Sequence, residues 1–249
     1  MPQRKEGFEN GEFYHVILRA LDDNLIFKDT NDYYRGIFSI YEFNNAKPVT
    51  IQARRKARIA FKNSLNKADR NPTSMQLPEF IDKREMMVEV LAFCFMPNHI
   101  HLLLKQLRGD GISKFMQKVG GGYARYFNNQ YERKGHVFQD TFKSVHIAGD
   151  NQFRVVVSYI FTNPVALIEP GWKKNGIRNH SIAEVIKFLE GYKWSNYQDC
   201  IGIKNFNSVT QRDFLIEMMN GEIGCKKAVE DWVSHKKDLA KYESLLLEN

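Results

Sequence analysis

The sequence lacks any apolar run long enough to cross a membrane, and it contains few cysteines. No stretch of about 18 consecutive apolar residues occurs, so no transmembrane helix is expected. No apolar segment follows the charged residues at positions 1–6, so no signal peptide is expected. The three cysteines, Cys94, Cys200 and Cys225, are far apart and odd in number, which favours reduced thiols in a cytoplasmic protein and argues against a zinc knuckle.

The composition is that of a folded, basic protein. The 249 residues are enough for one large domain or for a domain with an appendage. A hydrophobic content of 43% and an aromatic content of 13% support a packed core and argue against global disorder. The formal net charge of +7 favours a polyanionic partner, although charge alone does not identify one.

Alternating strand patterns and helical patterns follow one another in an order that predicts the fold class. Strands are expected over residues 13–20, 88–95, 99–105 and 136–147, and helices over 33–43, 112–131 and 150–163. Gly120-Gly121-Gly122 is expected to kink the second helix or to admit a second backbone, and Asp150 is expected to cap the third. The order β-α-β-β-α-β-α predicts an α+β fold, a ferredoxin-like antiparallel sheet with helices on one face.

Two histidines share one face of the third predicted strand. Side chains alternate along a strand, so His99 and His101 point one way, while Ile100, Leu102 and Leu104 point toward a core. Pro97 and the residues beside it form a turn, which places the pair at the rim of a hairpin. Such a pair can hold one metal ion or bind one phosphate, and it can also be two solvated edge residues.

Tyr159 and Asn163 are four residues apart in the third predicted helix and therefore lie on one of its faces. Taken alone, Tyr159 is typical of a core tyrosine, and Asn163 before a proline is typical of a hydrogen-bonding residue at a helix end. A basic segment, residues 50–70, is compatible either with a solvated helix or with an arm that contacts phosphates.

Several motifs in a fixed order resemble the single-tyrosine (HUH) transposases of the insertion-sequence-200 type, and among them the REP-associated tyrosine transposase branch. The His-Ile-His strand lies within Met96–Lys105, and the motifs that follow it span residues 111–119, 126–139, 159–165 and 192–197. The resemblance covers about residues 8–202, which implies a catalytic domain there, followed by a helical C-terminal extension over 203–249. That extension could be a DNA-binding module or an arm that covers the active site.

The resemblance implies the chemistry and the roles of the site residues. His99 and His101 would hold a divalent cation, Mg²⁺ or Mn²⁺, with Asn163 as a further ligand. Tyr159 would be the nucleophile, which attacks the scissile phosphate, forms a 5′-phosphotyrosine and frees a 3′-OH. The implied partner is single-stranded or hairpin DNA, and homodimer and monomer remain equally open. The expected backbone contacts are Arg19, Arg54, Arg55, Lys105, Arg125 and Lys143.

Two other functions remain open. The same fold could bind hairpin DNA without cleaving it, with the tyrosine as a remnant. A metal-dependent hydrolase that uses water would need a third strong ligand and a general base, and the nearest acids in the sequence, Glu89 and Asp140, do not have a clear spacing for either role.

Overall fold

The computed structural model describes residues 7–49, 56, 59, 63, 82, 84–139 and 141–234. Four strands form one sheet in the order β2-β3-β1-β4: β1 Phe13–Arg19, β2 Val88–Met96, β3 His99–Gln106 and β4 Lys143–Ile147. All three neighbouring pairs are antiparallel. The crossover helices α1 Thr30–Glu42 and α3 Gly111–Gln130 complete a β-α-β-β-α-β unit. The α+β, ferredoxin-like fold class is confirmed.

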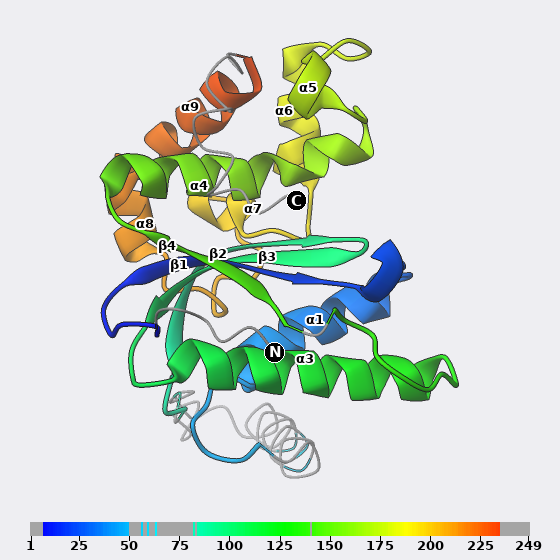
Figure 1. Cartoon of the computed structure of the whole chain (residues 1–249). Helices are drawn as coiled ribbons and strands as arrows, with labels where there is room; N and C mark the ends of the chain where they lie inside the picture. Colours follow the sequence, from blue (N-terminus) through cyan, green and yellow to red (C-terminus); the bar gives the residue numbers. More distant parts are fainter. Residues whose placement is uncertain are drawn as a thin grey trace.

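Helices cover both faces of the sheet, whereas the sequence predicted them on one (Figure 1). The crossover helices α1 and α3 lie on one face, and α4 Asp150–Thr162 lies on the other. The difference arises because β4 is followed by an amphipathic helix with no further strand to join, and its apolar stripe needs a surface to bury.

The remaining elements follow α4 and gather on its side of the sheet. They are η2 Asn163–Leu167, α5 Trp172–Asn175, α6 Ile182–Gly191, α7 Tyr197–Cys200, α8 Asp213–Met218 and α9 Gly221–Ser234; a short turn, η1 Leu21–Asp23, follows β1. Residues of α6, α7, α8 and α9 share one hydrophobic cluster with α4. The described part of the chain after α4 therefore packs on the side of the sheet that α4 covers.

Local chemistry explains where several helices begin and corrects one expectation. Asp29 caps α1 by accepting hydrogen bonds from the backbone N–H groups of Asn31 and Asp32. Gly149, not the predicted Asp150, is the N-cap residue of α4. Asp150 lies in the first turn, where its negative carboxylate interacts favourably with the helix dipole. Ser181 and Glu184 form a reciprocal capping box at the start of α6.

Helix α3 runs unbroken through its three glycines, so the predicted kink was wrong. A Cβ at Gly122 would come within 2.2 Å of the Phe43 ring, and one at Gly121 would meet nothing within 4 Å. Gly122 therefore permits close packing of α1 on α3, because a side chain at this position would overlap the Phe43 ring at the end of α1. The fourth strand is also shorter than predicted, because only Lys143–Ile147 pairs with β1.

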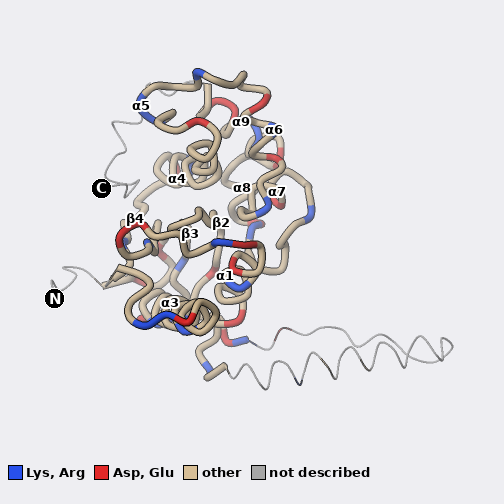
Figure 2. The backbone as a smooth tube through the Cα atoms, turned by 90° about the vertical axis from the view of Figure 1, so that its right-hand side faces the viewer, with Lys and Arg blue, Asp and Glu red and all other residues tan. Residues whose placement is uncertain are grey.

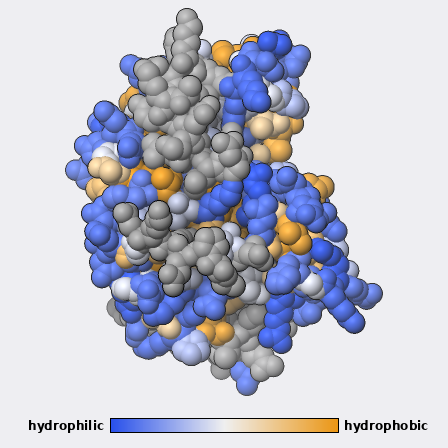
Figure 3. Space-filling model, viewed as in Figure 1, coloured by the Kyte–Doolittle hydropathy of each residue, from blue (hydrophilic) through white to orange (hydrophobic). Residues whose placement is uncertain are grey.

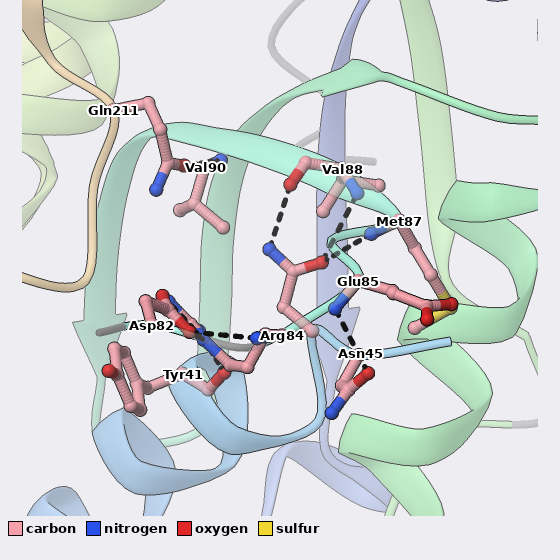
Figure 4. A network of polar contacts seen from close by, with 10 residues as sticks. Tyr41, Asn45, Asp82, Arg84, Glu85, Met87, Val88, Val90 and Gln211 are labelled. Carbon is pink, nitrogen blue, oxygen red and sulfur yellow. Dashed lines mark hydrogen bonds and ion pairs between the residues drawn. The ribbon is translucent and has the colours of Figure 1, made fainter. Parts of the chain in front are cut away.

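A polar network joins the end of α1 to the start of β2 (Figure 4). Asn44 accepts hydrogen bonds from the backbone N–H groups of Met87 and Val88, and its amide donates to the carbonyl of Val88 at 2.8 Å. Arg84 donates to the carbonyl of Tyr41 and to the carboxylate of Asp82. These bonds fix where the chain re-enters the sheet; the predicted basic segment, residues 50–70, lies outside the described residues apart from positions 56, 59 and 63.

Among the described residues, no helix is long and apolar enough to span a membrane. Figure 3 shows that the face seen in Figure 1 is largely hydrophilic, with apolar residues visible between polar ones. The three cysteines are free thiols and all are buried.

Candidate active site

The His-Ile-His strand lies in the sheet as predicted. His99 pairs with Arg19 and His101 with Ile17 across the β1–β3 ladder, so all four side chains face α4. Ile100, Leu102 and Leu104 point the other way, into the cluster formed with α1 and α3. His101 is 1% exposed and His99 is half-buried, and their ring centroids are 4.7 Å apart. The pair is therefore a partly covered site between sheet and helix.

A third histidine, which the sequence analysis did not single out, completes the cluster. His15 lies on β1, is fully buried, and has its Nε2 3.1 Å from Nδ1 of His101. The two rings are nearly parallel, with centroids 5.3 Å apart. The only sequence signal is that His15 alternates with core residues in a strand; its closeness to His101 depends on a strand register that the sequence does not display.

Helix α4 brings Tyr159 to the histidines. The Tyr159 ring centroid lies 5.4 Å from that of His101 and 5.7 Å from that of His15. Asn163 follows at the end of α4, where its Nδ2 donates to the Tyr159 carbonyl at 3.1 Å. Tyr159 and Asn163 are 1% and 2% exposed. Four residues predicted from two distant motifs thus lie together, although their roles remain proposals.

Two cations lie close to these residues. Lys173 of α5 donates to Asn163 Oδ1 at 3.2 Å and to the Tyr159 hydroxyl at 3.4 Å. Arg19, at the end of β1, faces the same side as its ladder partner His99 and also bonds Asp23 at 3.2 Å. The sequence predicted Arg19 as a phosphate contact, but it gave no reason to single out Lys173, which lies ten residues beyond Asn163.

Burial and positive charge keep the imidazoles neutral. Burial, with smaller contributions from Arg19 and Lys173, lowers the pKa of His99 to about 3. Burial and then the neighbouring His99 and His15 hold the pKa of His101 well below its ordinary value. Neutral imidazoles keep a lone pair for a metal or a proton donor. Burial raises the pKa of Tyr159, and the hydrogen bond with Asn163 and the charge of Arg19 oppose that rise.

The hydrogen bonds of His99 and His101 leave the Nε2 atom of each ring available to bind a ligand. Nδ1 of His99 lies 2.6 Å from the side-chain oxygen of Asn98, which can only accept, so His99 donates from Nδ1. Nδ1 of His101 is taken by His15, and its Nε2 is buried with no hydrogen-bond partner. Both Nε2 atoms therefore suit a shared ligand, in the way that outer-shell bonds orient metal-binding histidines.

A metal at this position would need oxygen ligands besides the histidines. Among the residues that the structure describes, no group of three or more His, Cys, Asp or Glu side chains could hold a metal ion. Asn163 could supply an amide oxygen, which here accepts from Lys173. The residues present therefore fit a mixed nitrogen and oxygen site that a phosphate would complete, which suits Mn²⁺ and, less well, Mg²⁺.

The other predicted DNA contacts are scattered. Lys143 lies on the site face, since Ile17 pairs with His101 on one side and with Lys143 on the other. Lys105 lies at the far end of β3 and pairs with Glu89 at 3.8 Å. Arg125 is exposed on α3, across the sheet. Arg54 and Arg55 lie outside the described residues. Figure 2 shows basic positions on α3 and at α5 with acidic ones interspersed, so the cations of the described residues form no single stripe.

Comparisons with known proteins agree with the sequence motifs. Residues 62–163, which include both histidines of the pair, Tyr159 and Asn163, match the family model described as "Transposase IS200 like". No curated protein matches the chain.

Two solved structures show distant similarity. One is a REP-associated tyrosine transposase bound to a REP hairpin, with 14% identity, a TM-score of 0.46, and coverage of 83% of this chain and 90% of that chain. The other is a protein from Deinococcus radiodurans R1 described as a candidate transposase, with 14% identity, a TM-score of 0.29, and coverage of 61% of this chain and 92% of that one. Over residues 62–163, the part of the chain that carries the His-Ile-His strand and Tyr159, the protein is therefore similar to the IS200-like transposases.

Proposed function

We propose that this protein is a transposase that cleaves and rejoins single-stranded DNA next to hairpins, through a 5′-phosphotyrosine on Tyr159. The observation that carries the proposal is the meeting of three features: the Tyr159 ring lies 5.4 Å from that of His101, Lys173 donates to its hydroxyl, and the His99–His101 pair stands beside it. The net charge of +7 is consistent with a DNA partner.

The reaction conserves the energy of the cleaved phosphodiester in a covalent bond between Tyr159 and the DNA. Oη of Tyr159 attacks the scissile phosphorus, an Oη–P bond forms, and the P–O3′ bond breaks. The phenol loses one proton and the leaving 3′ oxygen gains one, so the proton count balances. A 3′-OH on another strand can reverse these steps and release Tyr159. No nucleotide cofactor is needed, because one phosphodiester is exchanged for another.

The residues of the site have separate roles in this scheme. His99 and His101, with Asn163, would hold a divalent cation, Mg²⁺ or Mn²⁺, which when bound supplies polarisation of the phosphate and offsets developing charge. His15 would hold the ring of His101 in the orientation that leaves Nε2 available. Arg19 and Lys143, on the same face, would contact the DNA backbone.

A second candidate function has one observation in its favour. Tyr159 is 1% exposed, so DNA must displace a covering side chain before Oη can reach phosphorus. A protein that binds hairpin DNA without cleaving it would not need that displacement. It would bind the same DNA and form no covalent product.

A covalent-trapping assay tests the proposal. The protein is mixed with a labelled pool of DNA hairpins with single-stranded flanks and with Mn²⁺, then separated on a denaturing gel. We expect a protein–DNA band that requires the metal and disappears in Tyr159→Phe and His99→Ala. Tyr197→Phe is the matched control, because it removes a fully buried hydroxyl that has no hydrogen-bond partner in the described structure.

Each other outcome points to a different function. DNA shifted on a native gel without a denaturing-gel band would favour the binding protein. Metal-dependent cleavage that persists in Tyr159→Phe would favour the hydrolase. A band that survives in Tyr159→Phe would show that another residue is the nucleophile.

A further inference from the structure

Lys173 reaches the reacting oxygen from outside the matched family segment. Residues 62–163 contain the histidine pair and the tyrosine, whereas Lys173 belongs to α5, which follows the η2 turn. Its Nζ is 3.4 Å from the Tyr159 hydroxyl and 4.5 Å from the centre of the Tyr159 ring. Thus a charged group that contacts the nucleophilic oxygen comes from a separate element, the short helix α5.

The local fold holds Lys173 in this position. Trp172, its neighbour, is 1% exposed and belongs to the same hydrophobic cluster as Tyr159. Lys174, the next residue, is exposed. The short helix therefore has one buried aromatic anchor, and Lys173 lies partly buried over the end of α4.

Asn163 supports the same arrangement from the other side. Its Nδ2 donates to the Tyr159 carbonyl, and its Oδ1 accepts from Lys173 at 3.2 Å. The amide thus links the backbone of the tyrosine to the ammonium. A lysine that only filled space would not require its ammonium to bridge the hydroxyl and the amide of these two residues.

Negative charge develops on the oxygen that Lys173 contacts. During cleavage Oη becomes negatively charged as the phenol loses its proton to attack phosphorus, and during rejoining the negative charge returns to Oη as the Oη–P bond breaks. A fixed cation at a developing oxyanion stabilises both steps, and more strongly in a partly buried site than in water. Lysine suits this task because its ammonium is a compact point charge with several donors.

We propose that Lys173 is a catalytic residue of strand transfer, whose ammonium stabilises the charge on Tyr159 Oη while the Oη–P bond forms and breaks. This inference rests on the proposed function of Tyr159. It assigns Lys173 to the nucleophilic oxygen and not to the leaving 3′ oxygen.

The test is single-turnover formation of the covalent product with the hairpin pool and Mn²⁺. Lys173→Met removes charge and donor, Lys173→Gln keeps a donor, and Lys173→Arg keeps the charge. We expect Lys173→Met and Lys173→Gln to slow the step by about 10²–10³-fold, the usual cost of losing one oxyanion donor, and Lys173→Arg to recover part of the rate. Lys174→Met, at the adjacent exposed lysine, is expected to react like the wild type.

Two further measurements separate catalysis from folding and from the leaving group. Thermal melting and native-gel binding are expected to be unchanged in the Lys173 variants. DNA with sulfur in place of the bridging 3′ oxygen has a better leaving group. The Lys173→Met defect is expected to persist with it, because the lysine acts at Oη.

The outcomes distinguish this inference from the function on which it rests. A wild-type product that depends on Tyr159, with Lys173→Met reacting at the wild-type rate, would overturn the role of Lys173 and leave the proposed function standing. Full rescue by the sulfur-bridged DNA would overturn it too, since the lysine would then serve the leaving group. Absence of the product in the wild type would overturn both.

Discussion

The two faces of the sheet use the same four strands for different purposes. The face toward α1 and α3 buries an apolar and aromatic cluster that includes Ile100, Leu102 and Leu104. The face toward α4 also has an apolar cluster, but it buries His15, His101 and Asn163 beside it. Successive residues of one strand, His101 and Leu102, therefore belong to different environments.

The difference shows on which face the fold buries polar groups that destabilise the folded state but serve the candidate active site. A buried polar group destabilises the folded state unless it is hydrogen-bonded. On the α4 face the cost is offset by specific bonds, such as His15 to His101 and Asn163 to the Tyr159 carbonyl. On the other face the cluster around Leu102 is apolar and aromatic, and buried polar groups beside it, such as Asn44, are hydrogen-bonded to the backbone. Variants of the two faces should therefore separate stability from activity.

The largest effect on stability is expected on the α1–α3 face. Leu102→Ala leaves a cavity at a fully buried position, and it should lower the free energy of unfolding by about 2–5 kcal/mol. Urea unfolding measures this, and the trapping assay run below the melting temperature should still give the covalent product. A loss of product in a fully folded Leu102→Ala protein would break the distinction between the faces.

Replacing His15 and replacing His101 should have coupled effects on the free energy of unfolding. His101→Leu or His15→Leu alone removes the hydrogen bond between the two buried imidazoles, which should cost about 1–3 kcal/mol. The double variant removes both groups and should be less destabilised than the sum of the two. Urea midpoints in EDTA give the coupling energy, and Mn²⁺ binding should be lost whenever His101 is replaced. Additive effects would show that the 3.1 Å contact contributes nothing.

The glycines of α3 provide a matched pair on the stability face. Gly122→Ala places a methyl group within 2.2 Å of the Phe43 ring and should cost about 1–3 kcal/mol. Gly121→Ala meets nothing within 4 Å and should stabilise the helix by about 0.5–1 kcal/mol. Thermal unfolding compares the two, and equal effects would contradict the close packing of α1 on α3. Neither variant should alter the rate of covalent product formation.

The smallest effect is a pH dependence on the α4 side. Glu169 accepts from His180 Nδ1 at 3.1 Å and from the backbone N–H of Asn179 at 2.9 Å, and the bond from His180, followed by the backbone bonds, lowers the pKa of Glu169. A carboxylate with a lowered pKa stabilises the fold above its unfolded-state pKa, and the contribution disappears as the pH falls through the folded-state value. Wild-type stability should thus fall more steeply on acidification than that of Glu169→Gln. Urea midpoints between pH 7 and pH 3 test this, and parallel curves would contradict it.

The sequence predicted those parts of the site that local patterns encode. The alternation in β3 placed His99 and His101 on one side, and the four-residue spacing in α4 placed Tyr159 with Asn163; the structure brings these four residues together. It did less well where a short pattern stood alone. The glycine triplet was predicted to kink the helix or to admit a second backbone. The group that packs over Gly122 is instead the Phe43 ring, which comes from a distant element that no local pattern reveals. The expected DNA contact of Lys105 stays a prediction; its place in β3 is at the end away from His99.

By itself the sequence determined the strand and helix types, the antiparallel α+β class and the two motifs of the site, because each depends on periodicities within a few residues. Only the tertiary structure decided which face of the sheet α4 covers, and only it revealed His15 and Lys173. His15 is 86 positions from His101, and Lys173 is 14 positions from Tyr159 across a turn. Such contacts are set by strand register and helix packing, which are fixed by burying the apolar surface of the whole domain and not by any local pattern.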